Sequence, residues 1–424
     1  MRFIAISAAI VICRVTAQCT AKCCSNEGEL GRFPLWNSTY NMQDSTIIQP
    51  CNMSGFLDAP HFAQFGVVSI DWSNGKQIWV APPMSCEELL VEQAALLKAQ
   101  RPGVRVMGYR NIVKALPWFS SVREKMDDPS FASWFLKFDV HNSTPYHVPP
   151  CDDNYDPPKC SPFYHDMEQT PNFPKGDGDC PGPCDCGVHP CGEYLFDYSN
   201  ATNGLADFIV NDFILGPNGL GNENLTGFYL DDEWYNTSMF TGGCSGSPVG
   251  GPTEEDTHCL EDMGHAGDIA WTTTVTDTWC DVRHRVFEAA RLAGGWLWQM
   301  FVLQSTPTPA TCAPWIRGMC ALGASSPYYN GTVMHSMGKN ASLPNFDQDL
   351  ATFLLLRGDY AFLGFGWSGC GFVTPFPDAL KLDYGVPTDF CTETAPNSNV
   401  FSREWTKATI TMDCNSYKGS VVMK

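Results

Sequence analysis

The sequence predicts an α/β protein, an irregular (β/α)8 barrel of the TIM type with cysteine-rich loop insertions. Strand-like runs alternate with helix-like segments along most of the chain, as parallel βαβ units require. Roughly seven or eight such units favour a barrel over an open sheet. The chain has 424 residues, of which 44% are hydrophobic and 17% charged, so it can bury a full core.

Short apolar runs mark the expected strands, and each ends in polar or turn residues. Between them, Leu90, Ala94 and Leu97 recur at helical spacing after the capping sequence 85–88. The other long helices are expected at 121–138, 268–293 and 345–356. The strands are expected at residues 65–72, 104–110, 193–198, 225–231, 295–303, 328–334 and 360–366, with a final strand or hairpin in 401–412.

The N-terminus has the features of an export signal. Arg2 precedes an apolar run of eleven residues, and small residues before Gln18 form a cleavage site. That run is too short to span a bilayer, and the sequence contains no other candidate transmembrane segment. We therefore expect a signal peptide at 1–17, a disulfide-tied N-terminal extension at 18–60, the barrel at 61–415 with insertions 147–192 and 236–263, and a C-terminal tail at 416–424.

Composition points to a secreted, disulfide-bonded glycoprotein. The chain carries 20 cysteines, a number that is rare in cytosolic proteins. Loss of Cys13 with the signal leaves 19, so at least one thiol is free or bonded to another chain. The net charge of −20 argues against a nucleic-acid partner, and the sequence does not determine the oligomeric state. Asn-X-Ser/Thr sequons begin at Asn37, Asn52, Asn142, Asn200, Asn224, Asn236, Asn330 and Asn340.

Candidate functional residues lie at the carboxyl ends of the expected strands, where a barrel places its active site. Asp231 ends the fourth expected strand, Asp232 and Glu233 follow it, and these three are the candidate catalytic residues. Alternation along a strand puts Tyr229, Asp231 and Glu233 on one face. The candidate substrate-binding residues are Asp71, Trp72, Arg110, Asp197, Trp234, His335 and Trp367.

Clustered carboxylates beside aromatic rings suit glycoside hydrolysis, in which one carboxylic acid protonates the leaving oxygen and a second carboxylate attacks or activates water. Indole rings offer flat faces on which sugar rings can stack. A structural interpretation stays open, because acids after a strand also cap helices. For Asp71 and Asp197, a structural hydrogen-bonding role is about as well supported as contact with a ligand. Each tryptophan, taken singly, is more often a packing residue than a platform for sugar.

The segments 195–200, 224–234 and 383–387 resemble elements of the superfamily of glycoside-hydrolase-like (β/α)-barrels, which includes secreted eukaryotic members, over residues 62–415. The resemblance implies that Asp231 matches the catalytic aspartate of the fourth strand and Asp197 a sugar-binding position. The Asp-x-x-Asp-x-Asp-x-Glu pattern of chitinase-like barrels is absent, and no carboxylate ends the seventh expected strand. The partner of Asp231 is therefore unassigned, with Glu233, Asp232 and Asp71 as candidates in that order.

The expected function is a secreted enzyme that cleaves an O-glycosidic bond in an oligo- or polysaccharide, without a cofactor. Asp231 would be the nucleophile or principal catalytic carboxylate, and Glu233 the proton donor. The alternative is a secreted barrel that binds carbohydrate without cleaving it. Zinc ligation by Cys184, Cys186, His189 and Cys191 is less favoured than disulfide formation in an oxidising compartment, so no metal site is expected.

Overall fold

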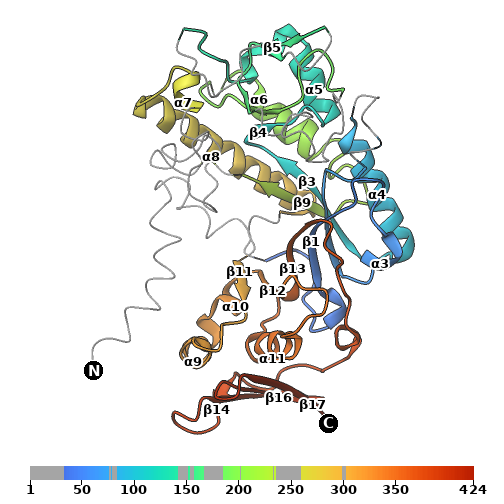
Figure 1. Cartoon of the computed structure of the whole chain (residues 1–424), viewed down its shortest axis with the longest axis vertical. Coiled ribbons are helices and arrows are strands. Elements are labelled where there is room, and N and C mark those ends of the chain that lie inside the picture. The colour runs from blue at the N-terminus through green and yellow to red at the C-terminus, as the bar shows by residue number, and fades with distance from the viewer. Residues whose placement is uncertain are drawn as a thin grey trace.

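The computed structural model places most of the chain in a mixed α/β architecture (Figure 1). The segment 1–17, expected to be a signal peptide, lies outside the described residues. So do Asn142, Asn236 and most of the two expected insertions. The structure describes residues 33–75, 78, 84–141, 151–152, 157–166, 185–200, 202–232, 234, 259–297 and 302–424.

One sheet of eight strands, all paired in parallel, forms the centre of the molecule. Its order is β10-β9-β3-β2-β1-β13-β12-β11. The α/β class and the parallel sheet expected from the alternating pattern are thus confirmed. The strands are β1 (Thr46–Cys51), β2 (Val67–Ile70), β3 (Arg105–Asn111), β9 (Gly227–Asp231), β10 (Trp296–Leu297), β11 (Val302–Ser305), β12 (Val333–Ser336) and β13 (Ala361–Cys370).

The sheet is strongly curled. Tyr229 of β9 and Trp367 of β13 are four strands apart, about 19 Å in a flat sheet, yet their ring centroids are 6.3 Å apart. Trp296 of β10 and Met334 of β12, about 29 Å apart in a flat sheet, belong to one hydrophobic cluster. The inner face is therefore wrapped around its own small core, as in a barrel. The edge strands β10 and β11 follow one another in the chain, so the single strand expected at 295–303 is divided in two.

Helices cover the outer face of the sheet, where they share the main hydrophobic core with outward-facing strand residues. In α4, the expected stripe of Leu90, Ala94 and Leu97 is buried. Ser85 precedes α4 as expected, but its side chain makes no capping hydrogen bond. The helices are α3 (Ala59–Phe62), α4 (Cys86–Gln100), α5 (Ser120–Asp127), α6 (Leu205–Phe208) with a following π-helical turn (Ile209–Ile214), α7 (Cys259–Asp262), α8 (Ile269–Leu292), α9 (Cys312–Leu322), α10 (Pro327–Asn330) and α11 (Phe346–Leu356).

Two strands differ from expectation. β1 lies within the segment expected to be an extension, but it is central in the sheet, between β2 and β13. The run expected as the third barrel strand, 193–198, instead yields β8 (Glu193–Leu195). This strand pairs antiparallel with β4 (Lys114–Ala115) and β7 (His165–Asp166) in a separate small sheet. An apolar run predicts a strand but does not specify the strand with which it pairs. The sequence pattern therefore could not show which of the two sheets contains β8.

A second sheet, antiparallel and of four strands, follows at the C-terminus. The expected hairpin in 401–412 is part of it, and residues 418–423 of the expected tail are its edge strand. Two disulfides, Cys312–Cys414 and Cys320–Cys391, join this sheet to α9. The strands are β14 (Thr392–Glu393), β15 (Val400–Glu404), β16 (Ala408–Asp413) and β17 (Lys418–Met423).

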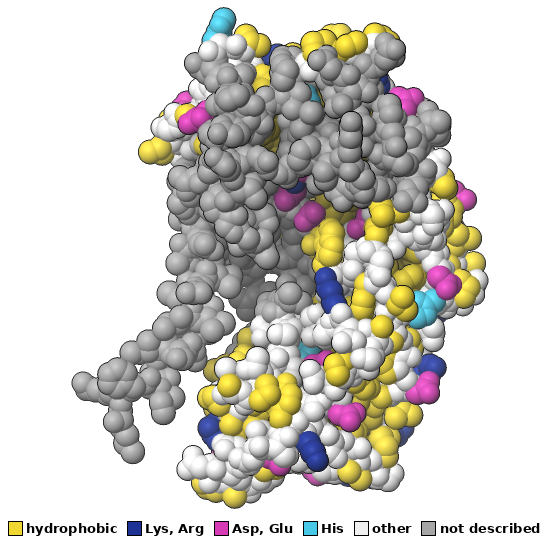
Figure 2. Space-filling model, in the orientation of Figure 1, with side chains coloured by type: hydrophobic (Ala, Val, Ile, Leu, Met, Phe, Trp, Pro, Cys, Tyr) yellow, Lys and Arg dark blue, Asp and Glu magenta, His cyan; other side chains and the backbone are white. Residues whose placement is uncertain are grey.

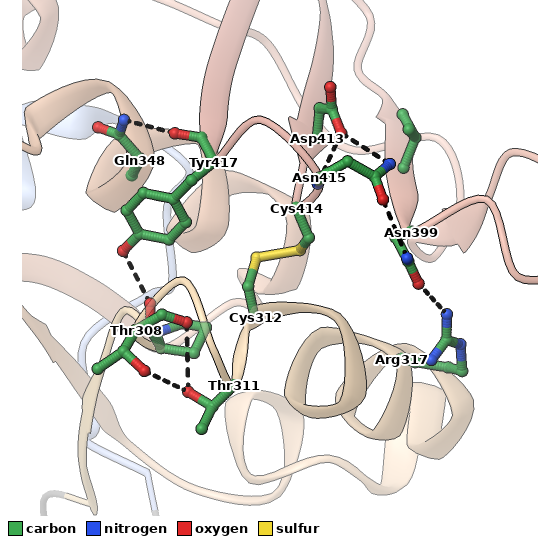
Figure 3. Close-up of a disulfide and its surroundings, with 12 residues drawn as sticks. Thr308, Thr311, Cys312, Arg317, Gln348, Asn399, Asp413, Cys414, Asn415 and Tyr417 are labelled. Carbon is green, nitrogen blue, oxygen red and sulfur yellow. Dashed lines mark hydrogen bonds between the residues drawn. A yellow bond between two sulfur atoms is a disulfide. The ribbon is translucent and has the colours of Figure 1, made fainter.

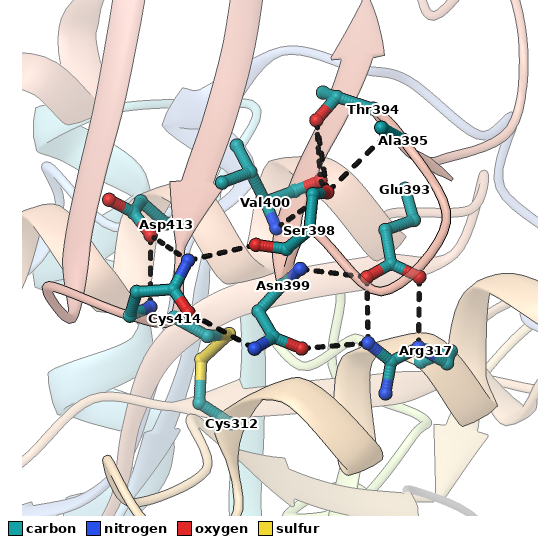
Figure 4. A network of polar contacts seen from close by, with 11 residues as sticks. Cys312, Arg317, Glu393, Thr394, Ala395, Ser398, Asn399, Val400, Asp413 and Cys414 are labelled. Atoms are coloured by element: carbon teal, nitrogen blue, oxygen red, sulfur yellow. Dashed lines mark hydrogen bonds and ion pairs between the residues drawn. A yellow bond between two sulfur atoms is a disulfide. The ribbon is translucent and has the colours of Figure 1, made fainter.

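A polar network reinforces this attachment (Figure 4). The guanidinium of Arg317 on α9 donates to both carboxylate oxygens of Glu393 and to the side chain of Asn399. These hydrogen bonds lower the pKa of Glu393 to about 2. The C-terminal sheet is therefore fixed against α9 by covalent and charge-assisted contacts.

The other disulfides within the described residues staple loops. Cys51–Cys370 joins the ends of β1 and β13, Cys151–Cys160 joins the two-residue strands β5 (Cys151–Asp152) and β6 (Lys159–Cys160), and Cys186–Cys191 closes a turn. Because Cys186 and Cys191 are bonded to each other, they do not form the zinc site considered above. Cys86, the first residue of α4, is buried. None of the described helices is long and apolar enough to cross a membrane.

Candidate active site at the ends of strands β3 and β9

The register of β3 and β9 brings four polar or aromatic side chains onto the inner face of the sheet. Tyr109 is paired with Tyr229, and Asn111 with Asp231. Paired residues of parallel strands face the same way, and residues two apart share a face. The rings of Tyr109 and Tyr229 lie nearly parallel with their centroids 6.2 Å apart. Asn111 and Asp231 end their strands, so they stand at the mouth of the curled sheet.

Asp231 is the chemically distinctive group at this mouth. The Tyr109 hydroxyl donates a hydrogen bond of 2.8 Å to Asp231 Oδ2. Burial, followed by the negative charge of Asp232, raises the pKa of Asp231 to about 7, although the bond from Tyr109 and the charge of Lys114 act in the opposite direction. A carboxyl group with this pKa carries a proton for much of the time near neutral pH, and it can act as an acid or as a base.

Asp232 is held beside it in an unusual backbone conformation. Its φ is +55°, in the left-handed region that few residues other than glycine adopt. Its Oδ2 accepts a hydrogen bond of 2.6 Å from Asn111 and lies 3.5 Å from the Lys114 ammonium, which also pairs with Glu193 at 2.5 Å. Figure 2 shows acidic side chains next to a basic one in a hollow of this face, in the region of β3 and β9. Strained residues cluster at functional sites, and these contacts fix this one.

Other predicted residues also lie at this mouth. Trp367 is 45% exposed and contacts Tyr229 with ring edges. Asp71 follows β2 and is buried, and its carboxylate accepts hydrogen bonds from the backbone and side chain of Ser73. Glu233 lies outside the described residues, so its expected role as proton donor stays a prediction.

Arg110 does not face the mouth, which corrects its expected contact with substrate. It lies between Tyr109 and Asn111 on β3, so alternation turns it to the outer face. There it is fully buried, pairs with Glu87 at 3.6 Å and donates to the backbone oxygens of Phe213 and Asn218. Its role is to satisfy the carbonyl groups at and beyond the end of the π-helical turn.

His335 also points outward, from β12. Its ring is fully buried between the Tyr328 hydroxyl and the Thr306 hydroxyl, at 2.6 and 2.9 Å. Burial lowers the pKa of His335 to about 3, so the ring is neutral. Asp197 follows β8, which is not part of the eight-stranded sheet, and it accepts a hydrogen bond from the backbone of Ser199. Neither residue reaches the mouth.

The tryptophans divide in the same way. Trp72 is buried and packs on Trp118 with a centroid separation of 4.6 Å. Trp234 is also buried in the main core. Of the three tryptophans expected to stack on sugar, only Trp367 offers an open face. The packing interpretation therefore holds for Trp72 and Trp234.

Sequence reasoning missed Tyr109, Asn111 and Lys114. The alternation that grouped Tyr229 with Asp231 on one strand also groups Tyr109 with Asn111 on its neighbour. Applied to β3, this signal would have selected these two residues in place of Arg110. Lys114 carries no such signal, because its place depends on the separate sheet with β8.

No family model and no curated protein sequence matches this chain. Among solved structures, three of cyclic α-maltosyl-(1→6)-maltose hydrolase from Arthrobacter globiformis are similar at 9% identity. The alignment with the complex that holds cyclic α-maltosyl-(1→6)-maltose covers 92% of this chain and 98% of the hydrolase chain, at a TM-score of 0.37. The maltose complex covers 94% and 96% at 0.34, and the ligand-free form 83% and 79% at 0.29. These scores are too low to identify a shared family, so the function rests on the site itself.

Proposed function

We propose that this protein is a secreted glycoside hydrolase that cleaves an O-glycosidic bond with Asp231 as its proton donor. The observation that carries the proposal is the pKa of Asp231, raised to about 7 by burial and by Asp232. A nucleophilic carboxylate must be ionised, whereas a general acid must hold a proton. The raised pKa therefore favours the acid role for Asp231 over the nucleophile role expected from the sequence.

In the proposed reaction, the Asp231 carboxyl group transfers its proton to the glycosidic oxygen as the bond from that oxygen to the anomeric carbon breaks. The leaving sugar departs as an alcohol, and positive charge develops on the remaining ring. Tyr109 stabilises the Asp231 carboxylate that forms, since it already donates a hydrogen bond to Oδ2. A second carboxylate then attacks the anomeric carbon directly or directs a water molecule to it.

Asp232, Asp71 and Glu233 are candidates for that second carboxylate. Asp232 is the nearest to Asp231 in the chain, but Asn111 and Lys114 already engage one of its oxygens. Asp71 follows β2, which is separated from β9 by β3 alone, so the two strands are roughly 10 Å apart.

Two further features support a secreted protein that acts on sugar. Trp367 offers an exposed indole at the mouth. The staple-like disulfides suit an oxidising compartment, and the described sequons Asn37, Asn52, Asn200, Asn330 and Asn340 are all exposed, with Asn224 half-buried.

The test is hydrolysis of a panel of neutral oligosaccharides by the full secreted chain, measured as the release of reducing ends. We expect Asp231→Asn to lower kcat about 10²- to 10⁴-fold, the usual contribution of a general acid. Asp212→Asn, a change at an exposed acid within the π-helical turn, should leave kcat unchanged. Binding of an oligosaccharide by the wild type without turnover would instead support the non-catalytic carbohydrate-binding barrel.

A further inference from the structure

A cavity of about 610 Å³ lies at the same end of the sheet as Asp231. Ser305 and Ser336, the last residues of β11 and β12, line it, and both strands run parallel to β9. The remaining walls are the loops that follow β11 and β12, the start of α11, and the turn between β16 and β17. Its volume is within the range of ligand sites, roughly 300–1,000 Å³, and it lies where two layers of the fold meet, as such sites often do.

The C-terminal sheet contributes one wall of this cavity through Tyr417, whose contacts are drawn in Figure 3. Tyr417, in the turn between β16 and β17, has its backbone oxygen bound by Gln348 of α11 and donates its hydroxyl to the Pro307 carbonyl. The Cys312–Cys414 disulfide fixes the same turn to α9. The tyrosine ring is therefore held in place over the loop that follows β11.

A buried chain of hydrogen bonds leads to the carboxyl group in this cavity. The Thr306 hydroxyl donates its proton in a hydrogen bond to the Asp349 carboxylate, so it accepts a hydrogen bond from His335 Nε2. The other nitrogen of the neutral ring, Nδ1, then accepts from the Tyr328 hydroxyl. The Thr306 hydroxyl and the Gly338 N–H in turn hydrogen-bond the carboxyl group of Asp349. Asp349 is 6% exposed and lies on the cavity wall, so the chain fixes its orientation toward that space.

The character of the lining selects the ligand. Serine, threonine and asparagine side chains supply hydroxyl and amide groups, and they lie beside apolar surface from Pro309, Met337, Leu343 and Pro344. The charged groups are one buried acid, Asp349, and one exposed base, Lys339. A strongly anionic or cationic ligand would meet a charge of its own sign, whereas a neutral polyol with one apolar ring face matches both kinds of surface.

We propose that this cavity is a subsite that binds a neutral sugar unit of the carbohydrate on which Asp231 acts, with Asp349 accepting hydrogen bonds from its hydroxyl groups. The proposal rests on the proposed function. It gives the C-terminal sheet a role in binding, because Tyr417 completes the site.

The experiment is isothermal titration of the full chain carrying Asp231→Asn with maltotetraose, cellotetraose and chitotetraose. Two changes are added singly: Asn345→Trp, which fills the cavity from its exposed rim, and Asp349→Asn, which puts an amide donor opposite the Thr306 and Gly338 donors. Ser420→Trp is the matched control, because it adds the same ring at an exposed position in a separate cavity beside β17. All are repeated with Asn340→Gln, because a glycan on that sequon would stand at the rim.

We expect at least one tetrasaccharide to bind, both cavity variants to weaken it about tenfold or more, and the control to leave it unchanged. Equal affinity in parent and cavity variants, or no binding of any of the three, would overturn the subsite. If binding depends on the cavity but the wild-type chain does not hydrolyse the sugar, the hydrolase function is refuted and the cavity remains a sugar site. If Asp231→Asn abolishes turnover but the cavity variants do not change binding, the hydrolase function is supported and the subsite is refuted.

Discussion

The two faces of β3 carry neighbouring polar residues with different functions. Tyr109 and Asn111 face inward and hydrogen-bond Asp231 and Asp232 at the mouth. Arg110, between them, faces outward and uses its guanidinium on an ion pair and backbone carbonyls. A polar residue near a strand end is thus reactive or structural according to its face, which alternation decides.

Protonation separates the faces as well. The inward Asp231 has its pKa raised to about 7, and the outward His335 has its pKa lowered to about 3. Burial disfavours the charged form in both cases. Near pH 7 the histidine is fixed as neutral, whereas the aspartate is close to the midpoint of its titration. Only the inner group is therefore able to exchange a proton under those conditions.

Substitution of the outward arginine should have the largest effect on folding. Arg110→Ala leaves Glu87 buried without its partner, so we expect about 3–5 kcal/mol of lost unfolding free energy in denaturant titrations. Arg285→Ala, which removes an exposed ion pair with Asp207, should cost less than about 1 kcal/mol. An Arg110 variant of normal stability but without activity would place this residue in the reaction and break the distinction between the faces.

The outward histidine should impose a pH dependence on stability. Its pKa is lower in the folded state than in the unfolded state, so the unfolded state binds more protons between about pH 6.5 and 3. The part of the unfolding free energy that depends on the neutral His335 ring is complete above about pH 6.5. It falls on acidification by about 1.4 kcal/mol per pH unit. In urea titrations, His335→Gln should remove this part of the slope. An unchanged slope would show that His335 is already charged in the fold.

Tyr109→Phe should shift activity along the pH axis rather than abolish it. The Tyr109 hydroxyl lowers the pKa of Asp231, so its loss raises that pKa further. As an acid, Asp231 is active when protonated, and activity falls as pH rises through its pKa. The alkaline limb of the kcat/KM profile should therefore move up by about one to two pH units, because a hydrogen bond to a charged group contributes about 1.5–3 kcal/mol. A downward shift would contradict the acid role.

The exposed tryptophan should have the smallest effect. Trp367→Ala removes a stacking face without opening a core, so we expect KM to rise about fivefold, equivalent to about 1 kcal/mol, with kcat little changed. Trp72→Phe alters a buried ring that packs on Trp118, and its effect should appear in thermal unfolding instead. If the two variants exchanged these effects, the assignment of faces to the tryptophans would be wrong.

Much of the architecture followed from the alternating pattern, because buried parallel strands leave long apolar runs. β1 escaped it because Gln49 and Pro50 interrupt its sequence. The fold tolerates that proline because β2 pairs with β1 only as far as Ile48. The run around β8 was assigned to the wrong sheet, since local sequence does not name a strand's partner.

The site was found in part for the same reason. Asp231 could be identified because it is a carboxylate at the end of an apolar strand. Its hydrogen-bond partner Tyr109 lies 122 positions earlier, and the pairing appears only through the register of β3 with β9. The raised pKa of Asp231 depends on burial and on Asp232, neither of which is a property of sequence spacing.

The central claim is that the inward carboxyl group of Asp231 holds a proton near neutral pH. It is tested most directly by ¹³C NMR titration of the labelled aspartate carboxyl carbons in the full chain, with Asp231→Asn to assign the signal. We predict that the signal missing from the variant titrates at about pH 7. A midpoint near the ordinary value of about 4 would contradict the claim.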